Sequence, residues 1–454
     1  MRQRLPVKPA FARGPLTTLQ TLKHVRKNVL NIIPQTALSE KIVTDHKRPR
    51  WHMVTDPDLL RRVLKDNVDN YPKSLVMKAL LRPGLGNSIL LADGAPWRWQ
   101  RRTTAPVFAP NYVRALGQTM TTATDQISRK IARKAASGPV NLYDDMTEVT
   151  FDIIANVTFS GDEGLDGKAM HQLINDYTYS VGKLSLMDLM AVPEWVPRPS
   201  HLLNRRTIKA LHRQAERAID LRRELGNANR PDDLLDLLLR TEDPKSGRRM
   251  TTKELRDNLL TFVIAGHETS ALALSWAFYL LGFDPERQAK ARAEAQAVLG
   301  TRTATADDVE NLPYIRAIID EALRLYPPAS LVGRAILRDD VLGDTKVFAG
   351  EAIMIPIFAL HRHRELWDAP DDFVPERWLQ TKWSERRYSY LPFGDGPRVC
   401  IGASFAIQES VIVLATLLAR FAFEAVPDKT PEPVMILTMR PSGGVWMKVT
   451  PLNA

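Results

Sequence analysis

The sequence predicts a mainly α-helical protein with small β-sheets. Helical periodicity of apolar residues dominates residues 112–326, and a Thr251-x-x-Glu254 capping box opens a long helix within this region. Short strand-like segments gather near the start and in the last third of the chain. No repeat, low-complexity tract or Gly/Ser linker divides the 454 residues. We therefore expect residues 1–454 to form one domain.

Composition and charge limit the class of protein. Hydrophobic residues make up 44% and charged residues 25%, as in ordinary globular proteins. The formal charge of +10 would suit nucleic acid, an anionic membrane or an acidic protein partner. Arginines come in short pairs such as Arg61-Arg62 and Arg101-Arg102, not in a long basic tract, so we predict no nucleic-acid binding. A single cysteine, Cys400, excludes an intrachain disulfide and favours a cytoplasmic location.

No transmembrane anchor is expected. The first twenty residues are basic, but three prolines interrupt them and no apolar stretch there resembles a signal h-region. The longest apolar stretch, residues 259–283, carries His267 and Glu268 near its middle, where ionisable groups would be costly in lipid. We interpret this stretch as a buried helix with a polar notch.

Local signals predict the individual elements. Strands are predicted at four segments: 51–54, 346–348, 352–357 and 434–438. Helices are predicted over residues 314–326, which Pro327-Pro328 ends, and over residues 403–421. The Pro-rich residues 192–200 are interpreted as a loop. Residues 368–391 lack periodicity, and such a long irregular stretch in a compact protein usually has a function.

The cysteine lies in a loop that suits a bound metal. Cys400 follows the Gly- and Pro-rich residues 393–399 and precedes the predicted helix 403–421. Glycines allow close approach to a ligand, and the N–H groups at a helix start favour a thiolate. A lone cysteine is most often a small buried hydrophobe. A zinc or iron–sulfur site would need several cysteines or clustered histidines, which this region lacks, whereas a haem needs one axial protein ligand.

This loop resembles the haem-binding signature of the cytochrome P-450 family, Phe-x-x-Gly-x-Arg-x-Cys-x-Gly. The matching residues are Phe393, Gly396, Arg398, Cys400 and Gly402. The resemblance implies the cytochrome P-450 fold, a helical prism enclosing haem b, with Cys400 as axial ligand of the iron. Phe393 would exclude water from the sulfur, and Arg398 would meet a haem propionate instead of facing solvent.

The apolar stretch carries a second motif, Ala265-Gly266-His267-Glu268-Thr269. An acid beside a hydroxyl can hold water and relay protons, and a glycine beside such residues can open a groove in a helix. The motif resembles the family's Ala-Gly-x-Glu/Asp-Thr. This resemblance implies that Thr269 steadies bound oxygen and that Glu268 helps deliver protons. His267 occupies the variable position and is assigned no role.

A third motif pairs Glu321 with Arg324 on one face of the predicted helix 314–326. An exposed pair with this spacing is common and contributes only about 0.3–0.5 kcal/mol. In the cytochrome P-450 family, Glu-x-x-Arg is completed by an Arg from a Pro-Glu-Arg-Phe-like segment, which Pro375-Glu376-Arg377-Trp378 resembles with Trp in place of Phe. The resemblance implies that Glu321, Arg324 and Arg377 form a structural support for haem insertion.

The haem propionates have further candidate partners. Trp97 and Arg101 lie four residues apart on one helix face and resemble the family's Trp-x-x-x-Arg. Their implied role is to donate hydrogen bonds to a propionate, with Arg334 as another candidate. The neighbouring Arg98 and Arg102 could substitute for Arg101.

The matched motifs occur in family order from Trp97 to Gly402. The resemblance implies a monooxygenase that inserts one atom of O2 into a hydrophobic small molecule, usually as a hydroxylation, with electrons from NAD(P)H. No reductase module follows the motifs, so we expect a separate ferredoxin or flavodoxin, drawn to a positive face around the Cys400 loop. We expect the chain to be a monomer.

Two alternatives stay open. One is a peroxygenase or isomerase of the same family, which needs no electron partner. The other is a non-catalytic haem-binding sensor, which needs the cysteine loop but not the pair Glu268 and Thr269. The substrate is expected against residues 71–91, 180–200 and 329–332, apolar segments that suit a fatty acid, a terpene or a steroid.

Overall fold

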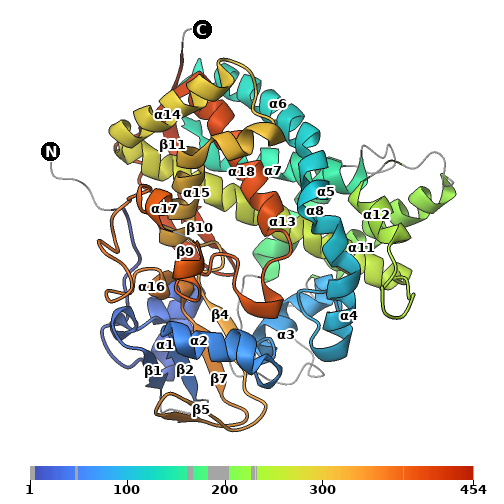
Figure 1. Cartoon of the computed structure of the whole chain (residues 1–454), viewed down its shortest axis with the longest axis vertical. Helices are drawn as coiled ribbons and strands as arrows, with labels where there is room; N and C mark the ends of the chain where they lie inside the picture. Colours follow the sequence, from blue (N-terminus) through green and yellow to red (C-terminus); the bar gives the residue numbers. More distant parts are fainter. Residues whose placement is uncertain are drawn as a thin grey trace.

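The structure is a computed structural model that describes residues 6–45, 50–160, 167–181, 204–225, 231, 233–381 and 383–452. Helices dominate this part of the chain and its strands form small sheets, as predicted. A four-stranded sheet lies at one end of the molecule, with α6 (Gly117–Ala135) and α14 (Pro285–Leu299) at the other (Figure 1). The predicted loop 192–200 lies outside the described residues.

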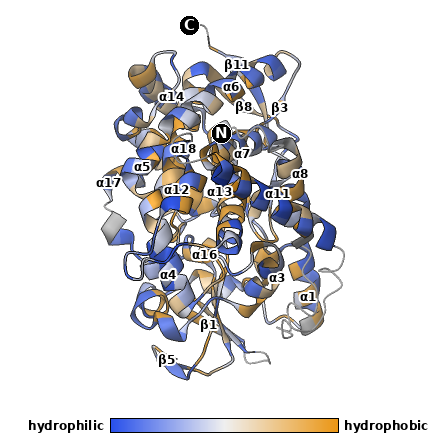
Figure 2. Cartoon of the chain, turned by 90° about the vertical axis from the view of Figure 1, so that its right-hand side faces the viewer, coloured by the Kyte–Doolittle hydropathy of each residue, from blue (hydrophilic) through white to orange (hydrophobic). Residues whose placement is uncertain are grey.

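The long central helix is α13 (Thr252–Phe283), which runs through the middle of the molecule (Figures 1 and 2). Its predicted capping box is present, because the Thr251 N–H donates to the Glu254 carboxylate at 2.9 Å and the Glu254 N–H donates to the Thr251 hydroxyl at 3.3 Å. Most of its residues are buried against α7 (Leu142–Phe159), α11 (Arg205–Glu224) and other helices. A helix surrounded by protein on all sides needs no polar face, which explains its continuous apolar sequence.

Helix α18 (Ala403–Arg420) begins just after the cysteine and matches the predicted helix except at its last residue. It packs against α6, α13, α14 and α15 (Pro313–Leu325). In the described part of the chain, α18 alone is long and apolar enough to cross a membrane, but most of it is buried inside the fold. We therefore interpret it as a core helix.

The strand predictions are partly right. The four-stranded sheet has the order β1-β2-β7-β4, and β2 (Trp51–Val54) lies where it was expected. The predicted strand 352–357 is β7 (Ala352–Ile355), which ends at Pro356 because proline cannot donate to the ladder. The predicted strand 434–438 is right for residues 434–435 and wrong for residues 436–438. β9 (Glu432–Met435) pairs with β10 (Met439–Ser442), so residues 436–438 connect two antiparallel strands.

The other described elements complete the fold. The helices are α1 (Thr18–Lys27), α2 (Pro57–Arg61), α3 (Leu75–Leu85), α4 (Gly94–Thr104), α5 (Pro110–Ala115), α8 (Gly167–Val181), α12 (Leu234–Arg240), α16 (Ile357–Leu360) and α17 (Arg377–Gln380). The strands are β1 (Ile42–Asp45), β3 (Val140–Asn141), β4 (Val332–Ala335), β5 (Asp340–Leu342), β6 (Thr345–Val347), β8 (Phe421–Ala425) and β11 (Trp446–Pro451). The irregular stretch 368–391 is confirmed apart from α17 and a short 3-10 turn.

Candidate active site

The cysteine loop reaches α18 through a tight backbone turn. Gly396 has a φ of 72°, and a Cβ there would lie 2.2 Å from the carbonyl oxygen of Leu64, so only glycine fits. The Cys400 N–H donates to the Phe393 carbonyl at 2.8 Å and closes the loop. Gly402 is the N-cap residue of α18. The loop therefore holds Cys400 directly before the helix, as the sequence predicts.

Protein atoms surround Cys400, but part of its side chain is exposed. Its side chain has free surface, although enough atoms surround it that burial raises the pKa of the thiol. The Gly402 N–H and the Arg101 guanidinium act in the opposite direction. The expectation that this loop alone favours a thiolate is therefore wrong, because burial outweighs the helix start. A thiolate here needs a stronger positive partner, which a coordinated iron supplies.

Two buried arginines lie beside the cysteine loop. Arg398 donates from Nη1 to the Tyr71 carbonyl at 2.7 Å, and its Nη2 lies 3.0 Å from Oδ1 of Asp93. Its guanidinium carbon is 5.7 Å from the ring centre of Trp97. Burial, reinforced by the nearby charge of Arg398, lowers the pKa of Arg334 to about 10. In the described structure, neither Arg334 nor Arg398 has an acceptor for its buried Nε–H.

These arginines fit the carboxylates of a haem. A buried donor without an acceptor is costly, and a planar guanidinium binds a carboxylate well. Arg101 of α4 interacts electrostatically with Cys400. The same helix carries Trp97, so α4 lies beside the cysteine loop. The structure thus assembles the predicted propionate partners around the loop: Trp97, Arg101, Arg334 and Arg398.

Part of the motif at the centre of α13 is exposed, although the helix is otherwise mostly buried. Ala265 is exposed and Thr269 is partly exposed, whereas the helix residues on either side are buried. The Thr269 hydroxyl donates to the Ala265 carbonyl at 2.7 Å, so its oxygen remains available as an acceptor. Uncovered atoms on a core helix are what a binding site for a cofactor and an apolar substrate requires.

Glu268 is buried and bound to β10 and to the residue before it. Its Oε1 accepts from the Thr438 hydroxyl at 2.8 Å and from Nε of Arg440 at 2.6 Å. The Arg440 side chain is 34% exposed, so this ion pair joins the interior of α13 to the protein surface. The predicted acid–alcohol pair therefore consists of Thr269 on the uncovered face and a carboxylate tied to an arginine that the sequence did not indicate.

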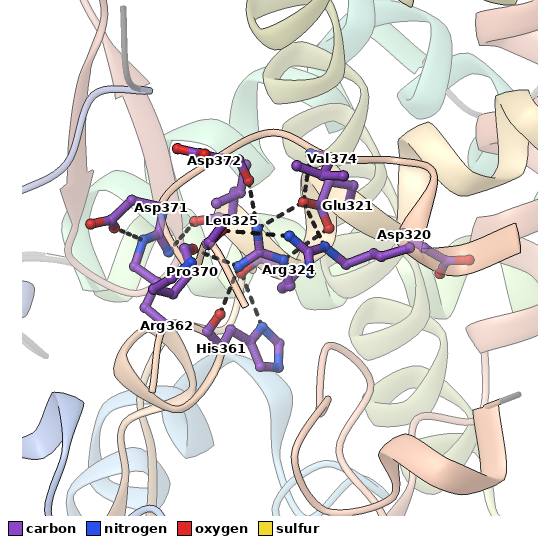
Figure 3. Close-up of polar contacts among 12 residues, drawn as sticks. Asp320, Glu321, Arg324, Leu325, His361, Arg362, Pro370, Asp371, Asp372 and Val374 are labelled. Atoms are coloured by element: carbon purple, nitrogen blue, oxygen red, sulfur yellow. Dashed lines mark hydrogen bonds and ion pairs between the residues drawn. The ribbon is translucent and has the colours of Figure 1, made fainter. Parts of the chain in front are cut away.

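Glu321 and Arg324 form the predicted ion pair, and both side chains are fully buried (Figure 3). Arg324 donates to both carboxylate oxygens of Glu321, at 2.7 and 2.8 Å, and Arg377 donates from Nε at 3.2 Å. Burial opposes ionisation of Glu321, but the two guanidiniums hold its pKa below the ordinary value. Arg324 also donates to three backbone carbonyls between residues 361 and 372. Glu321 and Arg324 are therefore not an exposed ion pair on the surface of the helix.

Comparison with known proteins decides the family. The family model named Cytochrome P450 matches residues 23–449. The chain belongs to the cytochrome P450 family. It is a haem-thiolate P450 monooxygenase with a mainly helical fold and small sheets.

Curated relatives of this P450 come from plants and bacteria. A chloroplastic protein of Arabidopsis thaliana, LUTEIN DEFICIENT 5, is 32% identical over 421 residues, which cover 88% of this chain and 70% of the relative. A cytokinin hydroxylase of the same plant is 30% identical, with 88% and 78% covered. A putative cytochrome P450 132 of Mycobacterium tuberculosis is 31% identical, with 87% of each chain covered.

His361, which the sequence analysis missed, links the buried ion pair of this P450 to the segment just before the cysteine loop. Its Nε2 accepts from the Leu391 N–H at 2.7 Å, and its Nδ1 lies 3.1 Å from the Arg324 carbonyl. A nitrogen that accepts carries no proton, so the proton is on Nδ1 and the ring is neutral. Burial lowers the pKa of His361 to about 3, which fits this assignment. No local pattern reveals such a long-range contact.

Lys73 is a second residue that the sequence analysis missed. Its Nζ donates to the carbonyls of Ile89 and Ala92 at 2.7 and 2.8 Å and lies 6.0 Å from the ring centre of Trp97. Burial lowers the pKa of Lys73 to about 7, with Arg398 and Arg334 adding to the effect and Asp93 opposing it. No local pattern separates Lys73 from the other basic residues of the segment 71–91, Lys78 and Arg82.

Trp378→Phe is expected to destabilise the protein by about 1–2 kcal/mol. Trp378 stands where the resembling motif has phenylalanine, and its indole N–H donates to Oε2 of Glu321 at 2.9 Å. Phenylalanine keeps the ring and removes this donor from a buried carboxylate. Denaturant unfolding measures the loss, and Trp446→Phe is the control, since its indole donates to the Gly443 carbonyl at an exposed position. Equal effects of the two substitutions would contradict the prediction.

Proposed function

We propose that this P450 hydroxylates a hydrophobic small molecule with one atom of O2, using electrons that a separate ferredoxin or flavodoxin carries from NAD(P)H. The observation that supports this most is the enclosed but uncovered thiol of Cys400 beside Arg101. Cys400 would be the axial ligand of haem b, and Phe393 would keep water from the sulfur. The propionates would be held by Trp97, Arg101, Arg334 and Arg398.

The residues of α13 have separate tasks in this proposal. Haem b, when bound, supplies the iron that activates O2, and a thiolate ligand favours O–O cleavage. Thr269, whose own proton is directed to the Ala265 carbonyl, accepts a hydrogen bond from a water at the uncovered face. Glu268 and the partly exposed Arg440 hold a route by which protons from solvent reach this helix.

The substrate class is inferred from the apolar segments 71–91 and 329–332, the second of which directly precedes the strand that carries Arg334. Most of the third predicted segment, 180–200, lies outside the described residues. A fatty acid, a terpene or a steroid fits such surroundings. The cytoplasmic location, the monomeric state and the single-domain organisation stay predictions.

Turnover under labelled oxygen tests the function. Haem-loaded protein is supplied with 18O2, NADPH and a surrogate ferredoxin with its reductase, with dodecanoic acid, a monoterpene and a steroid as trial substrates. We expect one labelled oxygen atom in a hydroxylated product. Product formation from hydrogen peroxide alone would indicate a peroxygenase. A haem-loaded protein inactive under both conditions would support the sensor alternative.

The double variant Arg98→Glu and Arg387→Glu is expected to slow reduction by an acidic ferredoxin about tenfold at low salt. Arg98 lies on α4, and Arg387 contacts Asp395 in the cysteine loop at 3.0 Å, so both flank the proposed docking face and both are about half exposed. Stopped-flow reduction rates at increasing salt measure the effect, which should disappear as charges are screened. Arg206→Glu on α11 is the control. An unchanged rate for the double variant at low salt would refute this docking face.

A further inference from the structure

Helix α18 carries a carboxyl group with no ionic partner. Glu409 is 0% exposed and stands in the apolar helix that begins just after Cys400. In the described structure, neither of its carboxyl oxygens has a hydrogen-bond partner. Among the described residues, no charged side chain of the helices packed on α18 influences Glu409, and the one polar group that does is the hydroxyl of Ser270 on α13. An unpaired buried charge would be costly at this position.

Ser270 behaves differently from the other hydroxyl residues of α13. Thr261, Thr269 and Ser275 each donate to the carbonyl four residues earlier in the helix. The buried Ser270 hydroxyl makes no hydrogen bond in the described structure. Ser270 is the polar group that acts on Glu409, and α13 packs on α18, so their free oxygens share one contact that a direct hydrogen bond or one buried water can satisfy.

Glu409 and Glu268 flank Thr269 in opposite surroundings. Consecutive residues of a helix project about 100° apart, so Glu268 and Ser270 lie on the two sides of Thr269. The Glu268 carboxylate pairs with Arg440, whereas Glu409, across Ser270, has no cation. Burial raises the pKa of Glu409 to about 8, and Ser270 opposes this only in part. Two acids with such different environments are suited to different tasks.

We propose that Glu409 is a positioning residue of the P450, which acts through Ser270 to tie the helix after Cys400 to α13 at Thr269. The inference rests on the proposed function in that Cys400 and Thr269 serve the same haem. Below pH 8 the protonated carboxyl donates to the Ser270 oxygen and the contact is neutral. When Glu409 loses its proton, the Ser270 hydroxyl is the one polar group left to stabilise a buried charge that has no cation, which loosens the contact.

Glu409→Gln gives the decisive comparison, because its amide still donates to Ser270 but does not ionise. The folded state holds the Glu409 proton up to about pH 8, whereas the unfolded chain releases it near the ordinary value of 4.5. Between these values the folded state binds more protons, so stability falls as pH rises. From pH 6 to pH 8, we expect the unfolding constant of the wild type to rise about 50-fold relative to that of Glu409→Gln.

The measurement uses haem-loaded wild type and variants between pH 6 and pH 9. The midpoint of thermal unfolding and the reduced carbon monoxide spectrum are recorded together. We expect the Tm of the wild type to fall relative to that of Glu409→Gln as pH rises toward 8 and the difference to level off above it. The wild type should lose its thiolate-type band above pH 8, while Glu409→Gln keeps it. Asp308→Asn is the control, because Arg302 holds the pKa of Asp308 at about 2 and its effect on Tm should not vary in this range.

Ser270→Ala provides a second variant that leaves Glu409 in place. We expect it to raise the pH at which the band is lost, because the Ser270 hydroxyl holds the pKa of Glu409 down. Parallel pH curves for wild type and Glu409→Gln, or an unchanged curve for Ser270→Ala, would overturn the proposal. A wild type without a thiolate band at any pH would defeat the proposed function instead, and the Tm comparison would still measure proton binding by Glu409.

Discussion

Cys400→Ser is expected to abolish the red-shifted band of the reduced carbon monoxide complex and to lower turnover more than about 100-fold. Removing even a residue that hydrogen-bonds a metal ligand commonly lowers metal affinity or activity 10- to 100-fold. Here the ligand itself is removed. A serine hydroxyl ionises far less readily than a thiol and donates less electron density to iron. The enclosed position of Cys400, where burial already opposes ionisation, strengthens this expectation.

The absorption spectrum of purified protein, reduced under carbon monoxide, makes the test direct. Serine is close in size to cysteine, so the hydrogen bond from the backbone N–H of residue 400 to the Phe393 carbonyl should remain. Near-UV circular dichroism checks that the variant is folded. Val399→Ala, in the same loop, is the control and should keep the band. A red-shifted band that persists in Cys400→Ser would mean that another group binds the iron.

Local signals identified the elements that carry the site. The capping box at Thr251 and Glu254 predicted the start of α13, and both of its hydrogen bonds are present. The switch from a Gly/Pro-rich loop to apolar periodicity predicted the start of α18 at Ala403. These signals succeed because capping and periodicity depend on residues a few positions apart.

The strand prediction at 434–438 failed beyond residue 435 because it also relied on neighbouring residues alone. The apolar run from Val434 to Met439 contains no Gly, Pro, Asn or Asp, so nothing in it marks a turn. The structure nevertheless reverses the chain there, since Met435 pairs with Met439. Pairing with a neighbouring strand overrides the local pattern.

Contacts between distant segments were not predictable from one sequence. Glu409 and Ser270 lie 139 residues apart, yet they meet where α18 packs on α13. Periodicity shows which face of a helix is apolar but not which helix it meets. The same holds for Lys73 and His361, whose partners lie outside their own segments or far along the chain. Arg101 and Arg398 were singled out in the sequence because they stand in segments that resemble known motifs.

Glu321→Gln is expected to destabilise the protein by about 3–5 kcal/mol and to lower the haem content of the purified chain. The Glu321 carboxylate accepts from Arg324, from Arg377, from the Val374 N–H and from the indole of Trp378. A glutamine amide would direct N–H groups at some of these donors. It would also leave Arg324 buried without its counter-charge, and an unpaired buried charge costs more than the pair contributes.

The matched control for this prediction has the same spacing on the surface. Asp220 and Arg223 of α11 are also three residues apart, with side chains 63% and 40% exposed and a separation of 3.7 Å. Asp220→Asn should change stability by less than about 0.5 kcal/mol, because an exposed pair gains little. Denaturant unfolding and the haem-to-protein ratio measure both variants. Because Arg324 binds backbone carbonyls of the segment that leads to the cysteine loop, Glu321→Gln should lose haem even at temperatures where it stays folded. Full haem loading in that variant would show that the buried pair stabilises α15 alone and does not support the cysteine loop.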